Sequence, residues 1–106
     1  MPPPITRVAR ARIDPSKRDE LLAAYETYAT AVAEDDGVLA WEFCTEADDE
    51  NVVWIIAAFA DTDAHARHME SPATAAVLPA IQSAMVEPPN MTALLPLYSV
   101  RVDRSG

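Results

Sequence analysis

Apolar and polar residues follow one another in a pattern that predicts four strands and two helical regions. Alternation and a high content of β-forming residues predict strands over residues 5–13, 38–46, 52–60 and 91–103. Apolar residues spaced three and four apart predict a long helix over 14–34, and the second helical region divides into 61–70 and 72–86. A polar turn over residues 47–51 joins the two middle strands and indicates a hairpin.

Capping and helix-breaking residues mark the ends of these elements. Asp14 followed by Pro15 begins the first helix, and Gly37 is suited to a left-handed turn after that helix. Pro79 predicts a kink or break in the last helix, and Pro96 predicts an edge or bulge in the last strand, because proline has no N–H to donate. The N-caps predicted for the shorter helices are Asp61 and Ser71.

The order of these elements, β-α-β-β-α-β, is the ferredoxin-like arrangement, an α+β fold in which helices cover one face of an antiparallel sheet. The strand over 52–60 is apolar on both faces, although one layer of helices covers only one of them. Half of the 106 residues are hydrophobic, which is high for a soluble monomer. We therefore expect one domain, residues 1–106 with a core over 5–102, that forms a homodimer to cover its sheet.

Charge and composition exclude several classes of function. The formal net charge of −9 repels phosphate backbones and anionic lipids, so neither nucleic acid nor a membrane is an expected partner. The chain shows no signal peptide and no apolar run long enough to cross a bilayer, so a cytoplasmic location is expected. The two glycines form no phosphate-binding loop, and the single cysteine, Cys44, is expected to be a buried, inert thiol.

His68 is the strongest single candidate for chemistry. An imidazole titrates near neutral pH and could take a phenolic proton, whereas packing at a helix end is the competing, structural interpretation. His65 lies three residues earlier, so both rings could share a metal with Asp61. Two imidazoles without a clear third ligand favour surface histidines instead, and neither a metal nor a cofactor is expected.

Several other side chains are candidates for binding. Six aromatic residues could line a pocket for a flat molecule, although most belong to an ordinary core: Tyr25, Tyr28, Trp41, Trp54, Phe59 and Tyr98. Arg10 and Arg12 could hold an anionic group, but cross-strand ion pairs with Glu42 or Glu46 are the favoured interpretation. The acidic residues near the hairpin turn lack the spacing of a calcium loop and indicate a solvated tip: Glu46, Asp48, Asp49 and Glu50.

Four segments share a pattern with a known family. They are the helix start at 14–20, the strand at 37–43 (Gly-Val-Leu-Ala-Trp-Glu-Phe), the strand and turn at 53–64, and the junction at 68–72 (His-Met-Glu-Ser-Pro). In these segments the chain resembles the antibiotic biosynthesis monooxygenase family, over about residues 5–102. The resemblance implies a dimeric α+β barrel, in which two sheets face each other across the dimer and the helices lie outside.

The resemblance also implies an activity. It implies a cofactor-independent monooxygenase that oxidises a small aromatic phenol or anthrone to a quinone with molecular oxygen. The substrate would lie between helices and sheet, with His68 as the base. The substrate-binding residues expected on this basis are Trp41, Phe59, Trp54, Tyr98 and Arg10.

The chain departs from the family pattern at several positions. A Glu near the end of the third strand and a second His after the Ser-Pro pair are replaced by Ala57 and Ala73. These losses support the alternative of a non-catalytic, dimeric small-molecule binding domain; an isomerase or cyclase on the same barrel is a third possibility. The positions that serve haem in the haem-degrading branch are Ala9, His68 and Leu78 here, and leucine cannot ligate haem iron.

Overall fold

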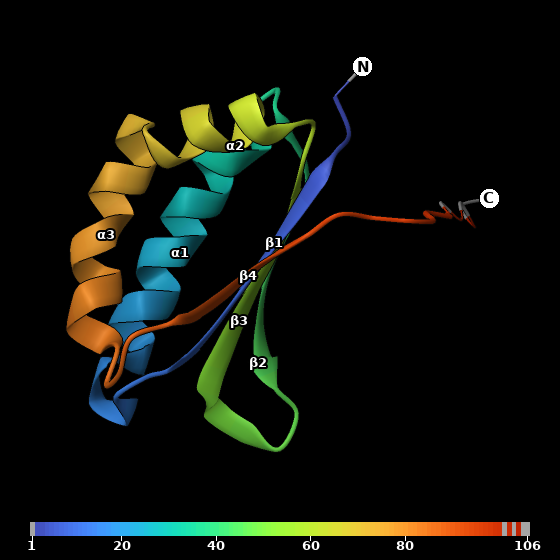
Figure 1. The fold of residues 1–106 in the computed structure, drawn as a ribbon. Coiled ribbons are helices and arrows are strands. Elements are labelled where there is room, and N and C mark those ends of the chain that lie inside the picture. Colours follow the sequence, from blue (N-terminus) through green and yellow to red (C-terminus); the bar gives the residue numbers. More distant parts are fainter. Residues whose placement is uncertain (1, 101, 103, 105–106) are drawn as a thin grey trace.

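The molecule is an antiparallel sheet of four strands with its helices packed against one face (Figure 1). The computed structural model describes residues 2–100, 102 and 104. The strands are β1 (Ile5–Arg12), β2 (Val38–Glu46), β3 (Asp49–Phe59) and β4 (Asn90–Leu94). The helices are α1 (Arg18–Ala33), α2 (Thr62–Met69) and α3 (Pro72–Ala84), and a short 3₁₀ helix, η1 (Pro15–Lys17), precedes α1. The predicted α+β, ferredoxin-like order of elements is confirmed.

The sheet order is β2-β3-β1-β4, and each neighbouring pair is antiparallel. The hairpin between β2 and β3 is tighter than predicted, because β3 begins at Asp49 instead of residue 52. Only Ala47 and Asp48 remain between the strands. Asp49 is therefore a strand residue, and its carboxylate lies 3.1 Å from Arg12 of β1 in an ion pair.

The core lies between the sheet and the helices. Alternation along the strands turns Ala11 and Val53 toward the helices, where they pack with the apolar stripe of α1: Leu21, Tyr25, Tyr28 and Val32. A second, smaller cluster joins Ala57 and Phe59 of β3 to Ala64 of α2. These two clusters enclose the space in which the candidate site lies.

The caps predicted at Asp61 and Ser71 are confirmed, whereas Asp14 caps the short helix η1 and not α1 itself. Asp14 accepts a hydrogen bond from the Ser16 N–H at 2.9 Å, and Asp61 accepts one from Ala64 at 2.8 Å. Ser71 caps α3 in the same way. Pro79 lies inside α3, which nevertheless runs without a break from residue 72 to residue 84.

Gly37 has a different role from the one predicted. Its backbone is not in the left-handed region, so the expected left-handed turn is wrong. A Cβ at this position would lie only 2.8 Å from the Cβ of Ala64 on α2. Glycine is needed here because the start of β2 passes directly against α2.

β4 is much shorter than the predicted strand 91–103, and the reason is the register of the sheet. Thr6 of β1 is the partner of Leu94, so continued pairing would place Pro4 opposite Pro96 and the other N-terminal prolines beyond. Prolines have no N–H to donate, and a ladder cannot continue between them. The strand therefore ends at Leu94, and the following segment runs away from the sheet (Figure 1).

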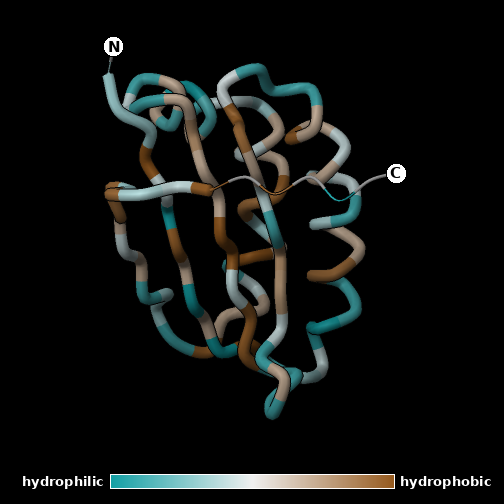
Figure 2. Tube along the Cα trace, turned by 90° about the vertical axis from the view of Figure 1, so that its right-hand side faces the viewer, coloured by the Kyte–Doolittle hydropathy of each residue, from teal (hydrophilic) through white to brown (hydrophobic). Residues whose placement is uncertain are grey.

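No described helix or strand covers the sheet face turned away from the helices (Figure 2). Ile56 of β3 and Leu94 of β4 lie on this face and are 39 % and 48 % exposed. Leu97 and Tyr98, in the segment after β4, are also largely exposed. Within the described residues, no helix has both the length and the apolar character needed to cross a membrane.

Candidate functional site

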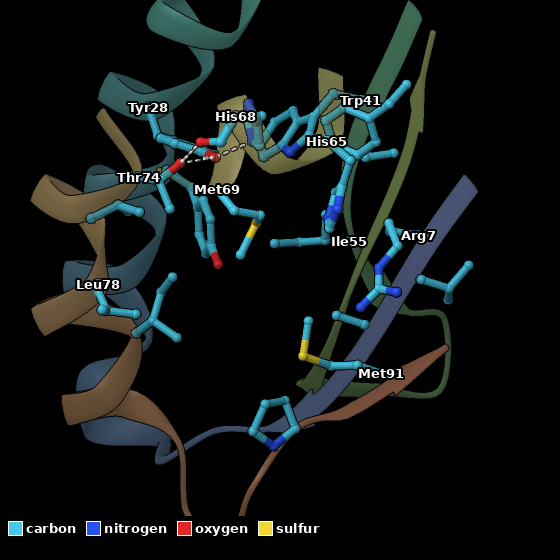
Figure 3. A pocket seen from close by; sticks show the side chains of 18 of the residues that line it. Arg7, Tyr28, Trp41, Ile55, His65, His68, Met69, Thr74, Leu78 and Met91 are labelled. Atoms are coloured by element: carbon cyan, nitrogen blue, oxygen red, sulfur yellow. Dashed lines mark hydrogen bonds between the residues drawn. The ribbon is translucent and has the colours of Figure 1, made fainter. Parts of the chain in front are cut away.

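A cavity of about 240 Å³ lies between the sheet and the helices (Figure 3). Residues from the strands and from α1, α2 and α3 line it, and most of them are apolar or aromatic. Three lining residues, Met69, Leu78 and Met91, are about half exposed, so the cavity reaches the surface beside them. A cavity of this kind suits a small, flat, apolar molecule.

His68 on α2 is hydrogen-bonded through both ring nitrogens. Its Nδ1 lies 3.0 Å from Oδ2 of Asp35, and its Nε2 lies 2.5 Å from the hydroxyl oxygen of Tyr28. A carboxylate only accepts hydrogen bonds, so Nδ1 carries a proton; when the ring holds only that proton, Nε2 accepts from Tyr28. The Tyr28 hydroxyl, and not a free ring nitrogen, is therefore the group that a ligand can meet at this end of the cavity.

Thr74, near the start of α3, holds the other side of the Tyr28 hydroxyl. The two hydroxyl oxygens are 3.0 Å apart, and the Thr74 oxygen also lies 2.8 Å from the backbone carbonyl oxygen of His68. The single Thr74 proton is donated to one of these two acceptors at a time. Three helices thus meet at one phenol: α1 supplies Tyr28, α2 supplies His68 and α3 supplies Thr74.

The surroundings shift the pKa values of Tyr28 and Asp35 in opposite directions. Burial raises the pKa of Tyr28; the hydrogen bond with Thr74 partly opposes this effect, and the charge of Asp35 reinforces it. Burial alone would raise the pKa of Asp35, but hydrogen bonds from His68 and the Gly37 N–H outweigh it and lower that pKa. Asp35 is consequently an anion at neutral pH, and Tyr28 is a neutral phenol that donates to His68.

Arg7 on β1 and His65 on α2 lie at another part of the cavity wall (Figure 3). Among the described residues, the Nε of Arg7 is buried without a hydrogen-bond partner. His65 packs edge-on against Phe59, with ring centres 4.9 Å apart. Burial, followed by the neighbouring charges of Arg7 and His68, lowers the pKa of His65, so this ring is neutral at pH 7.

Three of the residues predicted for the site line this cavity. They are Trp41, Phe59 and His68. The ring of Trp41 lies 5.8 Å from that of Tyr28, and the ring of Phe59 lies 5.1 Å from that of His68. The predicted base and two predicted aromatic residues are thus close together in space.

The other three predicted residues lie elsewhere. Arg10 and Trp54 are cross-strand partners on the uncovered face, since residues one apart on a strand point to opposite faces. Both bind the Glu46 carboxylate, Arg10 at 2.9 Å and Trp54 at 2.8 Å, which is the structural ion pair that the sequence favoured. Tyr98 is 95 % exposed, because the strand predicted to hold it ends at Leu94.

In the described part of the chain, no three His, Cys, Asp or Glu side chains gather as a metal site. His65 and His68 both line the cavity, but His68 already engages Asp35 and Tyr28. The spacing of the two histidines suggested a shared metal, but no third ligand lies beside them among the described residues.

Sequence reasoning missed three residues of the site. No local pattern in the sequence connects Asp35 or Thr74 to His68. Arg7 could have been found, because it shares the inward-facing alternation of Ala9 and Ala11 on β1.

The fold and the site together define a class: small α+β domains whose helices and sheet enclose an apolar ligand cavity with a hydrogen-bonded Asp-His-Tyr chain on its wall. The chain matches the family described as antibiotic biosynthesis monooxygenase over residues 4–79, and it belongs to that family. A search of curated proteins found no match.

Solved structures share this fold at low sequence identity. Rv0793 from Mycobacterium tuberculosis is 21 % identical, with a TM-score of 0.85 over 92 % of this chain and 99 % of that one. A candidate antibiotic biosynthesis monooxygenase from Caulobacter crescentus is 22 % identical, with a TM-score of 0.85 over 92 % of each chain. PA3566 from Pseudomonas aeruginosa is 16 % identical, with a TM-score of 0.82 over 92 % of this chain and 98 % of that one. These similarities establish the fold.

Proposed function

We propose that this protein is a cofactor-independent monooxygenase that acts on a small aromatic phenol or anthrone, and that it works as a homodimer. The observation that supports this most directly is the Asp35-His68-Tyr28 chain on the wall of an aromatic-lined cavity. Membership of the monooxygenase family supports the same reaction class.

The chain of hydrogen bonds can move a proton away from a bound substrate. A substrate hydroxyl that meets the Tyr28 oxygen can give its proton to that oxygen as Tyr28 gives its own to Nε2 of His68. Asp35 holds the Nδ1 proton and stabilises the imidazolium that forms. Since the pKa of Tyr28 is raised, the negative charge comes to lie on the substrate and not on Tyr28.

The substrate anion supplies the electrons for the reaction. In an anthrone, the reacting methylene becomes a carbonyl; one atom of oxygen enters the product and the other leaves as water, so that the substrate is oxidised and oxygen reduced. The protein contributes deprotonation, orientation and an apolar environment around the anion. The aromatic rings of Trp41 and Phe59 line the cavity, which supports their proposed role in holding a flat substrate.

Oxygen consumption tests this proposal. Purified protein is incubated with a panel of anthrones and hydroxyanthracenes, and oxygen uptake and quinone absorbance are followed together. We expect one oxygen molecule per quinone. We also expect a loss of about 100-fold or more in kcat for Tyr28→Phe and for His68→Ala, as general-base catalysis contributes on that scale.

Trp54→Phe is the matched control, because Trp54 lies on the opposite face of the sheet and does not line the cavity. Its rate should equal that of the wild type. The proposal is contradicted if no substrate of the panel gives oxygen uptake above that of buffer. It is also contradicted if Tyr28→Phe and the wild-type protein have equal rates of oxygen uptake.

A non-catalytic binding domain is the second candidate, and two observations favour it. His68 is only 5 % exposed and fully hydrogen-bonded, as a structural histidine would be. The family's additional Glu and His are Ala57 and Ala73 in this chain. Binding of the panel without turnover would support this candidate, whereas product without oxygen uptake would indicate an isomerase or cyclase.

A further inference from the structure

The cavity differs from the rest of the molecule in the sign of its charge. The chain has 17 acidic and 8 basic side chains. Yet no Asp or Glu is among the described residues that line the cavity, whereas Arg7, His65 and His68 are. Arg7, the lining residue whose side chain is always a cation, thus lies on a wall without any described carboxylate.

Arg7 is also unlike the other basic residues of the sheet. Arg10 and Arg12 on the same strand each have a carboxylate partner, at 2.9 Å and 3.1 Å. No described carboxylate lies within 4.0 Å of the Arg7 guanidinium, and its Nε is buried without any hydrogen-bond partner. A buried, unsatisfied donor on a cation costs free energy, and an anion supplied by a ligand removes that cost.

We infer that Arg7 is the anion-binding residue of the cavity, and that the ligand is a flat apolar molecule with an acidic group, such as an aromatic carboxylate. This inference rests on the cavity being the ligand site of the proposed function, and it names the substrate class for that site. The apolar part of the ligand lies among the aromatic side chains, and its acidic group pairs with Arg7. A planar guanidinium can meet a carboxylate with two parallel hydrogen bonds.

His65 supports the same assignment. It lines the cavity with Arg7, and its lowered pKa keeps the ring neutral, so one ring N–H remains available as a donor. An anion bound beside Arg7 would offset the positive charge that depresses this pKa. Proton uptake on binding of the acid is therefore an additional expected signature, measured as a dependence of the binding enthalpy on buffer ionisation at pH 6–7.

A pair of ligands of equal shape tests the inference without any turnover. 2-Naphthoate and the neutral 2-naphthamide are titrated into the wild-type protein by isothermal calorimetry at pH 7.5. We expect the acid to bind about 10- to 100-fold more tightly, the range of a hydrogen-bonded charge pair. Equal affinities for the two compounds, or no binding of either, would overturn the inference.

Variants locate the preference at Arg7. Arg7→Gln should abolish the preference for the acid and leave the affinity for the amide within about threefold, and Arg7→Lys should restore part of the preference. Arg10→Gln is the matched control, because it removes the same charge from the opposite face of the same strand. The inference is contradicted if Arg10→Gln reduces the preference for the acid as much as Arg7→Gln does. It is also contradicted if Arg7→Gln lowers the affinities for the acid and the amide equally.

The binding result and the oxygen result can fail separately. If the protein prefers the acid but consumes no oxygen, the anion site is supported and the monooxygenase proposal is contradicted. If the protein oxidises neutral anthrones but shows no preference for the acid, the monooxygenase proposal is supported and the anion site is contradicted. Thermal unfolding of each variant confirms that it is folded before its affinity is compared.

Discussion

At the scale of single residues, the decisive feature is that Asp35, His68 and Tyr28 act as one group. Asp35 keeps a proton on Nδ1 of His68, and in the singly protonated ring Nε2 is then the acceptor for Tyr28. Burial then keeps Tyr28 neutral. Two predictions follow from these hydrogen bonds, independently of any reaction.

The first prediction concerns the dependence of stability on pH. The pKa of Asp35 is lower in the folded protein than its ordinary value of 3.8. Its ionised form therefore stabilises the fold at pH values above that ordinary value, and the contribution is lost as pH falls through the lowered pKa. Asp35→Asn should reduce the free energy of unfolding by about 1.5–3 kcal/mol at pH 6, and the difference from the wild type should shrink below pH 4.

Denaturant unfolding between pH 6 and pH 2.5 measures this difference. Asp36→Asn is the control, since Asp36 is the exposed neighbour of Asp35. A difference for Asp35→Asn that stays constant down to pH 2.5 would show that its carboxylate charge is not involved.

The second prediction concerns Thr74. Thr74→Val keeps the shape of the side chain but removes the hydroxyl that contacts Tyr28 and the His68 carbonyl. We expect the free energy of unfolding to fall by about 1–3 kcal/mol, since buried polar groups lose a partner. Thr30→Val on the exposed side of α1 should change it by less than about 0.5 kcal/mol. Equal effects of the two substitutions would contradict a special role for Thr74.

At the scale of elements, the position of α2 decides whether His68 can reach Asp35. The start of β2 passes so close to α2 that only glycine fits at position 37. The same turn presents the Gly37 N–H to Asp35 at 2.9 Å. Local packing of β2 on α2 is thus directly connected to the geometry of the site.

Gly37→Ala should therefore both destabilise the protein and disturb the site. The added Cβ would lie 2.8 Å from the Cβ of Ala64, and we expect a loss of about 1–3 kcal/mol from overpacking. Ala64→Gly removes that contact, so the double variant should lose less than the sum of the two single variants. Strict additivity in denaturant unfolding would show that the contact is not the cause.

Element boundaries show where sequence reasoning works and where it stops. The caps at Asp14, Asp61 and Ser71 were predicted because each cap is a contact between neighbours in the sequence. The end of β4 was not, because it depends on which residues of β1 lie opposite it. Pro96 predicts an edge or bulge, but the strand ends before it because continued pairing would place Pro4 of the neighbouring chain segment opposite it.

At the scale of the whole molecule, the uncovered sheet face is the surface that indicates how the protein assembles. Ile56 and Leu94 are exposed on it, and the segment after β4 leaves the molecule on the same side (Figures 1 and 2). Exposed apolar side chains on a sheet face favour pairing with a second copy, which would complete the barrel of the proposed homodimer.

Sedimentation equilibrium at micromolar concentration should accordingly show a dimer. Ile56→Lys places a charge on the uncovered face and should raise the dissociation constant by at least about 30-fold, the effect of losing a strong contact residue. Val86→Lys, which changes an exposed apolar residue outside the strands, should leave the dimer intact. A wild-type protein that remains monomeric would contradict the dimer proposal.

The sequence alone determined the order of the elements and most of the helix caps, because these depend on backbone periodicity and on contacts between near neighbours. It also placed Trp41, Phe59 and His68 in one candidate site, through the family resemblance. Only the tertiary structure decided that Asp35, Tyr28 and Thr74 meet His68, that Arg7 lines the cavity without a described carboxylate partner, and that Arg10, Trp54 and Tyr98 lie outside it. These outcomes depend on how helices pack and how strands register across tens of residues, where no local pattern fixes the distance between two side chains.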